Sequence, residues 1–209
     1  MNSIFQKLSL VAGCSMLLFT NCKKDETTGS NDFQPLTTGS TWTYQNTPGG
    51  TSVLTMTGRD TVAQGKTYRV LSNSNGVNNY FRKDGNDYYR FGVLQALGNA
   101  TIEELYLKGD QKVGDTWTTT QNLPYLGQLV PATLTYTIQA KGIEQTVSGK
   151  NYKNVVHVKF SAGALAFKIG QGDFYYAGGI GLIKGDLIVT PPGAADIVQS
   201  QVLTDYSIK

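Results

Sequence analysis

The chain has 209 residues, of which 24 are glycine and 12 are tyrosine, and only 16% are charged. Its formal net charge of +3 comes without a cluster of lysine and arginine, which argues against nucleic acid as a partner. The frequent Thr, Tyr, Val and Gly residues favour strands and turns over helices. The chain is long enough to bury a sizeable core.

The N-terminus has the features of a lipoprotein export signal. Lys7 precedes an apolar run from Leu8 to Phe19, which is shorter than the roughly 20 residues that cross a bilayer core. We therefore expect residues 1–21 to be removed as a signal peptide and Cys22 to carry the lipid. Cys14 is the alternative lipidation site, although cleavage there would leave an apolar stretch on the mature chain.

The segment that follows the lipidated cysteine is expected to be a tether. Residues 22–33 are rich in Lys, Asp, Thr, Gly, Ser and Asn, a composition typical of flexible segments. Because two or more acyl chains anchor a protein stably, we expect the domain to be tethered to a membrane without spanning it. The segment Cys22–Glu26 resembles the start of Bacteroidetes lipoproteins, and this resemblance implies the outer membrane, on its periplasmic face or at the cell surface. Cys14 and Cys22 are the two cysteines of the sequence. The mature domain, residues 34–209, is therefore expected to fold without a disulfide.

Residues beyond the tether predict antiparallel strands joined by hairpins. Ala132–Ala140 alternates Leu, Tyr and Ile with Thr and Gln, the period of a strand with two different faces. Asn75-Gly76 and Asp84-Gly85 are typical of tight hairpin turns. Leu94–Leu105 and Ala194–Gln199 are the best helical candidates, and both are weak. The whole pattern favours roughly a dozen strands and argues against a parallel α/β sheet.

A set of short motifs occurs twice, in the same order. The matched pairs are Gly39–Thr43 with Gly114–Thr118, Leu54–Thr57 with Leu134–Thr137, Thr61–Tyr68 with Thr146–Tyr152, and Asp87–Tyr89 with Asp173–Tyr176. Composition alone could make strand and turn motifs recur, but the conserved order favours an internal duplication with halves at 35–108 and 109–209. We predict an all-β, antiparallel fold in which two pseudo-repeated meanders form an open barrel or a two-sheet sandwich.

Residues that could carry chemistry are few. His157 is the one histidine, and its place between two valines favours a solvent-facing strand residue over a catalytic relay or a zinc ligand. Glu103 and Glu104 are adjacent and would point to opposite faces of a strand, unlike the paired carboxylates of a glycosidase. Asp84–Asp87 favours a hairpin turn over a calcium loop. Gly178–Gly181 favours a close backbone approach over a phosphate cradle. We therefore expect no enzyme activity, no metal and no cofactor.

Aromatic residues are the most suggestive feature of the sequence. Tyr80, Tyr88, Tyr89, Tyr175 and Tyr176 fall on predicted strands, where adjacent residues place one ring on each face. One face would belong to the core. The other could form an exposed aromatic surface for a glycan, a peptide or an envelope protein.

Three motifs resemble segments of a Bacteroidetes-type family of outer-membrane lipoproteins that has no established activity. They are Pro35–Tyr44, Gly149–Val158 and Tyr175–Lys184. The family is similar to TapB-like and LolA/LolB-like half-barrels, but this chain has no strong helical segment to match the helices that LolA-type carriers place inside the barrel. The resemblance implies a membrane-anchored, non-enzymatic binding or accessory module. The alternative is a carrier of lipids or other hydrophobic ligands, which a large apolar concavity would favour.

Overall fold

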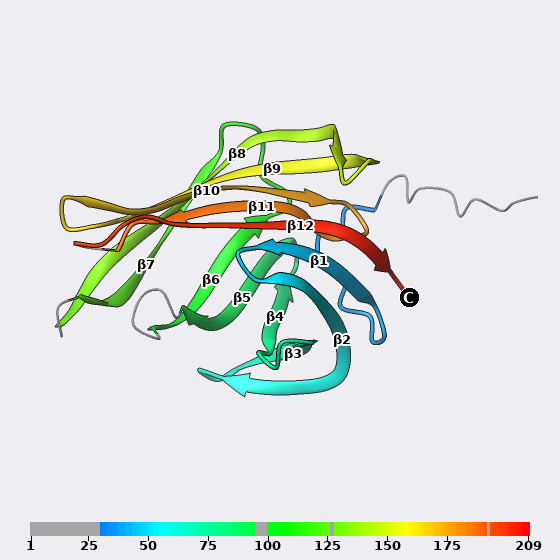
Figure 1. The fold of residues 1–209 in the computed structure, drawn as a ribbon, viewed down its shortest axis with the longest axis horizontal. Helices are drawn as coiled ribbons and strands as arrows, with labels where there is room; N and C mark the ends of the chain where they lie inside the picture. Colours follow the sequence, from blue (N-terminus) through cyan, green and yellow to red (C-terminus); the bar gives the residue numbers. More distant parts are fainter. Residues whose placement is uncertain (1–29, 95–99, 126–127, 192) are drawn as a thin grey trace, which may run out of the picture.

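The computed structural model describes residues 30–94, 100–125, 128–191 and 193–209. One antiparallel sheet of twelve strands curls into a nearly closed barrel (Figure 1). No α-helix occurs within these described residues, and none of their segments is a helix that could cross a bilayer. The predicted all-β, antiparallel class is confirmed, and the open barrel is found rather than the two-sheet sandwich.

Two meanders of six consecutive strands make up the sheet. The first contains β1 (Thr41–Thr47), β2 (Gly50–Ala63), β3 (Lys66–Asn73), β4 (Asn79–Asp84), β5 (Asp87–Leu94) and β6 (Ala100–Lys108). The second contains β7 (Thr116–Tyr125), β8 (Gln128–Val147), β9 (Lys150–Ala164), β10 (Phe167–Ala177), β11 (Gly181–Val189) and β12 (Ile197–Ser207). Within each meander, neighbouring strands in the sequence are neighbours in the sheet.

The two meanders are joined on one side by backbone pairing and on the other by side chains. Strands β1 and β12 form a ladder that runs from Thr41 opposite Ser207 to Thr47 opposite Ser200. Strands β6 and β7 are the two ends of the strand order and share no ladder in the described part of the chain. We call the junction of β6 with β7 the seam.

Both weak helical candidates are wrong where the structure describes them. Residues 100–105 belong to β6, and residues 197–199 begin β12. In β6, Ile102 and Glu104 are buried while Thr101 is exposed, an alternation of period two that the ladder with β5 imposes. Pairing in the sheet therefore overrides a weak local preference for helix. Residues 95–99 of the first candidate lie outside the described residues.

The described N-terminal segment closes one end of the barrel, the right-hand end in Figure 1. The Phe33 side chain is only 1% exposed, and its backbone N–H donates to the Tyr88 hydroxyl at 3.1 Å. The backbone N–H of Gly179 donates to the carbonyl of Asp32 at 2.7 Å. The chain is therefore packed against the barrel from Ser30 onward, whereas the sequence places the tether through residue 33.

The glycine-rich turn after β10 makes room for that segment. A Cβ atom on Gly178 would lie 2.0 Å from the carbonyl oxygen of Ser30, so no larger residue fits without displacing the backbone. This close approach of two backbones is the role that the sequence predicts for Gly178–Gly181.

The strand order allows the repeated motifs to be placed on the fold. The first three matched pairs fall on strands that occupy the same places in the two meanders, whereas Asp87–Tyr89 lies on the fifth strand of its meander and Asp173–Tyr176 on the fourth. Trp42 lies opposite Leu54, and Trp117 lies opposite Tyr136. The fold therefore makes Leu54 equivalent to Tyr136, two residues beyond the Leu134 with which the sequence motif pairs it. The duplication itself stays a prediction.

Candidate functional site

The interior of the barrel is not completely filled by side chains. A cavity of about 400 Å³ lies between the two meanders, within the size range of small-molecule sites. Its walls are mostly apolar: Ile102, Leu134, Phe160, Ala162, Ile169, Phe174, Leu187 and Val189. It reaches the surface beside the β3–β4 connection, where Asn75 and Val77 line it and are exposed. We call this space the apolar compartment.

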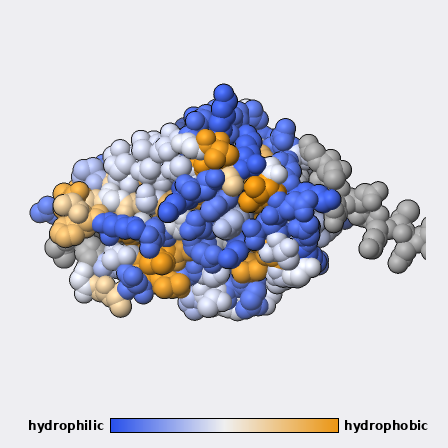
Figure 2. All heavy atoms as spheres, turned by 90° about the horizontal axis from the view of Figure 1, so that it is seen from above, coloured by the Kyte–Doolittle hydropathy of each residue, from blue (hydrophilic) through white to orange (hydrophobic). Residues whose placement is uncertain are grey.

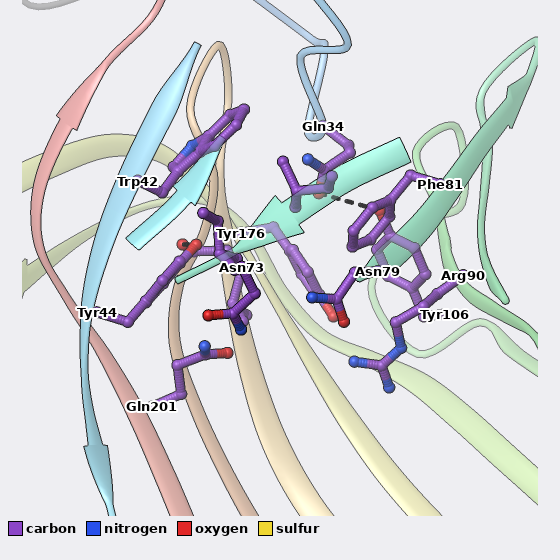
Figure 3. Close-up of a pocket in the computed structure, with 13 residues that line it drawn as sticks. Gln34, Trp42, Tyr44, Asn73, Asn79, Phe81, Arg90, Tyr106, Tyr176 and Gln201 are labelled. Atoms are coloured by element: carbon purple, nitrogen blue, oxygen red, sulfur yellow. Dashed lines mark hydrogen bonds between the residues drawn. The ribbon is translucent and has the colours of Figure 1, made fainter. Parts of the chain in front are cut away.

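A smaller and more polar space of about 120 Å³ adjoins it (Figure 3). Its lining includes Gln34, Trp42, Tyr44, Asn73, Asn79, Arg90, Tyr106, Tyr176 and Gln201. We call it the polar compartment. Asn73, Asn79 and Arg90 line both spaces, so these three side chains mark the boundary between an apolar and a polar region.

An ion pair lies at this boundary. Arg90 on β5 donates from Nε and Nη2 to Glu104 Oε2 on β6, at 3.1 and 2.5 Å. The other carboxylate oxygen, Glu104 Oε1, accepts from the Tyr136 hydroxyl at 2.8 Å. The Glu104 side chain is 8% exposed, whereas that of Arg90 is 42% exposed. Arg90 lines both compartments and is the more accessible partner, whereas Glu104 lines the apolar compartment alone and has little exposed surface.

The same network reaches across the seam. Trp117 on β7 donates from Nε1 to the carbonyl of Leu105 at 2.8 Å, and Gln121 donates to the carbonyl of Glu103 at 2.8 Å. Side chains of β7 thus satisfy carbonyl groups on the free edge of β6, where a partner strand would otherwise bind. The Tyr136–Glu104 bond also links the second meander to the first, so the cavity wall and the closure of the barrel depend on the same residues.

Two amide side chains of the polar compartment accept a hydrogen bond through their oxygen atoms. Asn73 Oδ1 accepts from the backbone N–H of Asn75 at 3.2 Å. Gln34 Oε1 accepts from the Tyr106 hydroxyl at 3.4 Å, the bond that Figure 3 marks with a dashed line. Their amide N–H groups make no hydrogen bond within the described residues, so these two side chains offer a ligand mainly donors.

Protonation states in this region follow from the contacts. The charge of Glu104 raises the pKa of Arg90 and outweighs the opposing effect of burial. Burial raises the pKa of Tyr106 and of Tyr176 well above the usual range. The guanidinium therefore stays charged, and both phenols stay neutral hydrogen-bond donors, over the physiological pH range.

The five tyrosines proposed as an aromatic surface do not gather on one face. Tyr88 and Tyr176 are buried in the barrel, at 1% and 6% exposure. Tyr80 contacts Phe91, and Tyr89 lies under the Arg82 guanidinium. Tyr175 lies on the second meander, stacked on His157. No row of exposed tyrosines forms among them.

The remaining candidate residues lie outside the cavity. Glu103 and Glu104 point to opposite faces, as predicted, and Glu103 accepts from Tyr68 at 2.5 Å and from Arg82 at 3.1 Å. His157 is half-buried on the outer face and pairs with Asp173 at 2.7 Å, so it is less open to solvent than the sequence predicts. Asp84–Asp87 forms the β4–β5 hairpin turn.

Several hydrogen-bond donors surround the Glu103 carboxylate and favour its charged form. Burial alone would raise the pKa of Glu103, but hydrogen bonds from Lys66, Tyr68 and Arg82 outweigh it and lower that pKa. The cluster lies on the face of β6 opposite to Glu104. Glu103 is therefore a carboxylate next to Glu104 that lines neither compartment.

Exposed apolar side chains occur at the end of the barrel where the apolar compartment opens. Five large residues lie on the connections and strand ends that meet there: Val77, Leu129, Leu165, Phe167 and Val198. Figure 2 shows apolar residues at this left-hand end of the molecule. The N-terminal segment covers the opposite end.

Comparison with known proteins gives similar folds at low sequence identity. A candidate lipoprotein from Parabacteroides distasonis matches 86% of this chain and 100% of its own at 10% identity, with a TM-score of 0.45. A candidate exported protein with a YmcC-like fold from Bacteroides fragilis covers 83% and 97% at 11% identity, with a TM-score of 0.43. The hypothetical lipoprotein YmcC from Escherichia coli covers 79% and 83% at 12% identity, with a TM-score of 0.41.

No family model and no curated protein sequence matches the chain. The resemblance to TapB-like and LolA/LolB-like half-barrels stays a prediction. The sequence shows the Glu103-Glu104 pair but not its role, because the partners Arg90 and Tyr136 are 14 and 32 residues away from Glu104.

Proposed function

We propose that this chain is an envelope lipoprotein whose barrel holds an amphipathic ligand. The hydrocarbon part of the ligand would lie in the apolar compartment and its polar part in the polar compartment. The observation that carries the proposal is the cavity of about 400 Å³ with apolar walls, which adjoins a space lined by amides and a guanidinium. Sites that bind small molecules are typically apolar with a few well-placed polar groups.

This proposal favours a carrier of hydrophobic ligands, which was the alternative function considered from the sequence, over a module with a glycan-binding surface. A glycan module would need exposed rings in a row, and two of the five tyrosines concerned, Tyr88 and Tyr176, are buried. A concave apolar interior is what a hydrophobic ligand requires. The exposed apolar residues around the open end would ease transfer of such a ligand to or from a partner.

A membrane anchor is the second part of this proposal. After removal of a signal peptide of residues 1–21, a lipid on Cys22 would tether the barrel by its closed end, because the described N-terminal segment lies there. The open end of the cavity would then lie away from the point of attachment. Outer-membrane location is part of this proposal, and intact-mass analysis of the protein from its native host would test the acylation of Cys22.

A neutral fluorescent probe tests the cavity directly. N-phenyl-1-naphthylamine should bind the purified barrel and gain fluorescence, and the variant Ala162→Phe should abolish this binding, because Ala162 lines the apolar compartment and is 7% exposed. Val62→Phe is the matched control, because Val62 is 70% exposed on the β2–β3 side and its replacement should leave binding unchanged. A folded wild-type protein that binds no probe, or an Ala162→Phe protein that binds it normally, would refute the proposal.

A further inference from the structure

We infer that the ligand carries an anionic head group, a carboxylate or a phosphate ester, that binds the Arg90 guanidinium at the boundary of the two compartments. This inference rests on the proposed function and adds the chemical class of the head group. The ligand would be a chain amphiphile whose hydrocarbon part fills the apolar compartment.

The orientation of the ion pair is the first argument. Glu104 uses one oxygen for two bonds from Arg90 and the other for the bond from Tyr136, and its side chain is nearly inaccessible. Arg90 uses Nε and Nη2 for Glu104, so Nη1 makes no hydrogen bond within the described residues. A planar guanidinium with free N–H groups facing a cavity is suited to a carboxylate or phosphate.

The balance of donors and acceptors around Arg90 is the second argument. The oxygens of Asn73 and Gln34 each already accept one hydrogen bond within the protein, whereas their N–H groups make none within the described residues. Tyr176 adds a neutral hydroxyl whose oxygen makes no hydrogen bond in the described structure. Figure 3 shows the Asn79 amide and the Arg90 guanidinium beside the same open space. A head group rich in acceptor atoms and poor in donors would satisfy this lining.

The distribution of charge is the third argument. Among the described residues that line the polar compartment, Arg90 is charged and none is Asp or Glu. In the apolar compartment the acidic lining residue is Glu104, whose oxygens are directed at Arg90 and Tyr136. A cationic head group would meet no available carboxylate in either space, because both oxygens of Glu104 already accept hydrogen bonds. A neutral head group could accept from Arg90 Nη1, but it would lack the charge that strengthens a hydrogen bond from a guanidinium.

Calorimetric titration with four probes of equal chain length tests the inference. The probes are dodecanoate, dodecyl phosphate, dodecanol and dodecyltrimethylammonium, all at pH 8. We expect at least one anionic probe to bind about tenfold more tightly than dodecanol, which corresponds to about 1.4 kcal/mol, and the cation to bind most weakly. The ranking of dodecanoate against dodecyl phosphate distinguishes the two anionic head groups.

Three variants assign the preference to Arg90. Glu104→Gln removes the carboxylate that competes for the guanidinium and should strengthen binding of the preferred anion severalfold, with dodecanol unchanged. The double variant Arg90→Gln with Glu104→Gln leaves no unpaired buried charge, and it should bind the anion and dodecanol equally. Glu103→Gln is the matched control, because Glu103 lies on the other face of β6 and should leave both affinities unchanged.

The outcomes separate this inference from the proposed function. Equal binding of dodecanol and both anions by the wild-type protein would overturn the anionic head group and leave the cavity as the binding site. Binding of none of the four probes would overturn the proposed function itself. Selectivity that survives in the double variant would overturn the role of Arg90. If the double variant does not fold, two other results test the inference. They are the ratio of the affinities of the wild-type protein for the anion and for dodecanol, and the change in anion affinity in Glu104→Gln.

Discussion

Two buried tyrosines offer a matched test of the hydrogen-bond network, because one hydroxyl has a partner and the other has none. Tyr136 is 1% exposed and its hydroxyl donates to Glu104 at 2.8 Å. Tyr152 is 4% exposed, and its hydroxyl oxygen is buried without a hydrogen-bond partner in the described structure. Replacing each by phenylalanine removes the same atom from two different environments.

The expected magnitudes follow from those environments. A hydrogen bond to a charged group contributes roughly 1.5–3 kcal/mol, so Tyr136→Phe should lower the free energy of unfolding by about 2 kcal/mol. A buried hydroxyl without a partner is itself unfavourable, so Tyr152→Phe should leave the free energy of unfolding unchanged or raise it by up to about 1 kcal/mol. Both variants keep the ring and its packing.

Urea unfolding followed by tryptophan fluorescence and circular dichroism measures both changes. The dependence of free energy on urea should be the same for both variants and the wild type, so that the midpoints report stability directly. The melting temperature of Tyr136→Phe should fall by about 4–8 °C, the shift typical of this loss in a protein of this size. Equal free energies for the two variants, or a neutral Tyr136→Phe, would refute the assigned hydrogen-bond network.

Three further outcomes are expected. Glu103→Gln should destabilise the protein at pH 7, and urea unfolding should show a smaller difference from the wild type below about pH 4. The pKa of Glu103 is lower in the folded than in the unfolded protein. The carboxylate therefore stabilises the fold above the unfolded pKa, and this stabilisation is lost as the pH falls through the folded pKa. Phe33→Ala should lower the free energy of unfolding by about 3 kcal/mol, measured in the same way, because the ring is fully buried. Gly178→Ala should displace the backbone at Ser30 and speed amide exchange of Gly179, whose N–H bonds to the N-terminal segment.

The chain supplies controls for the last two of these variants. Phe167 is 64% exposed, so Phe167→Ala should change stability by no more than about 0.5 kcal/mol. A Cβ atom on Gly92 would meet nothing within 4 Å, so Gly92→Ala should leave the exchange of Gly179 unchanged. If Phe33→Ala matched Phe167→Ala, the N-terminal segment would not be part of the fold.

Local sequence signals predicted much of the fold because hairpins are local. The alternation in Ala132–Ala140 identifies β8, and Asp84-Gly85 identifies the β4–β5 turn. The adjacent tyrosines also follow the predicted alternation, because Tyr88 and Tyr176 are buried and Tyr89 and Tyr175 are not. The register shifts beside them place the extra residue on the partner strands β6 and β11, so the period of two along β5 and β10 is kept. The sequence alone does not show which member of each pair faces the core.

The cavity was harder to predict from the sequence than the strands were. The Arg90–Glu104 pair depends on which strands are neighbours and on their register, and the Glu104–Tyr136 bond depends on how the barrel closes. None of these is a local property of the chain. Phe33 was likewise assigned to the tether by its polar neighbours, although its ring finds a pocket against Tyr88, with the ring centres 6.3 Å apart.

The β1–β12 ladder has a consequence for how the chain folds. All the remaining ladders in the described part of the chain join strands that are consecutive in the sequence, so each can form from its own turn. The β1–β12 ladder must instead bring Thr41 beside Ser207, and closing so long a loop slows folding. A circular permutant whose old ends are linked and whose new ends lie at 109–115 would contain only nearest-neighbour hairpins. The permutant would keep the same strand pairing, but its folding would no longer require two strands that are far apart in the sequence to pair.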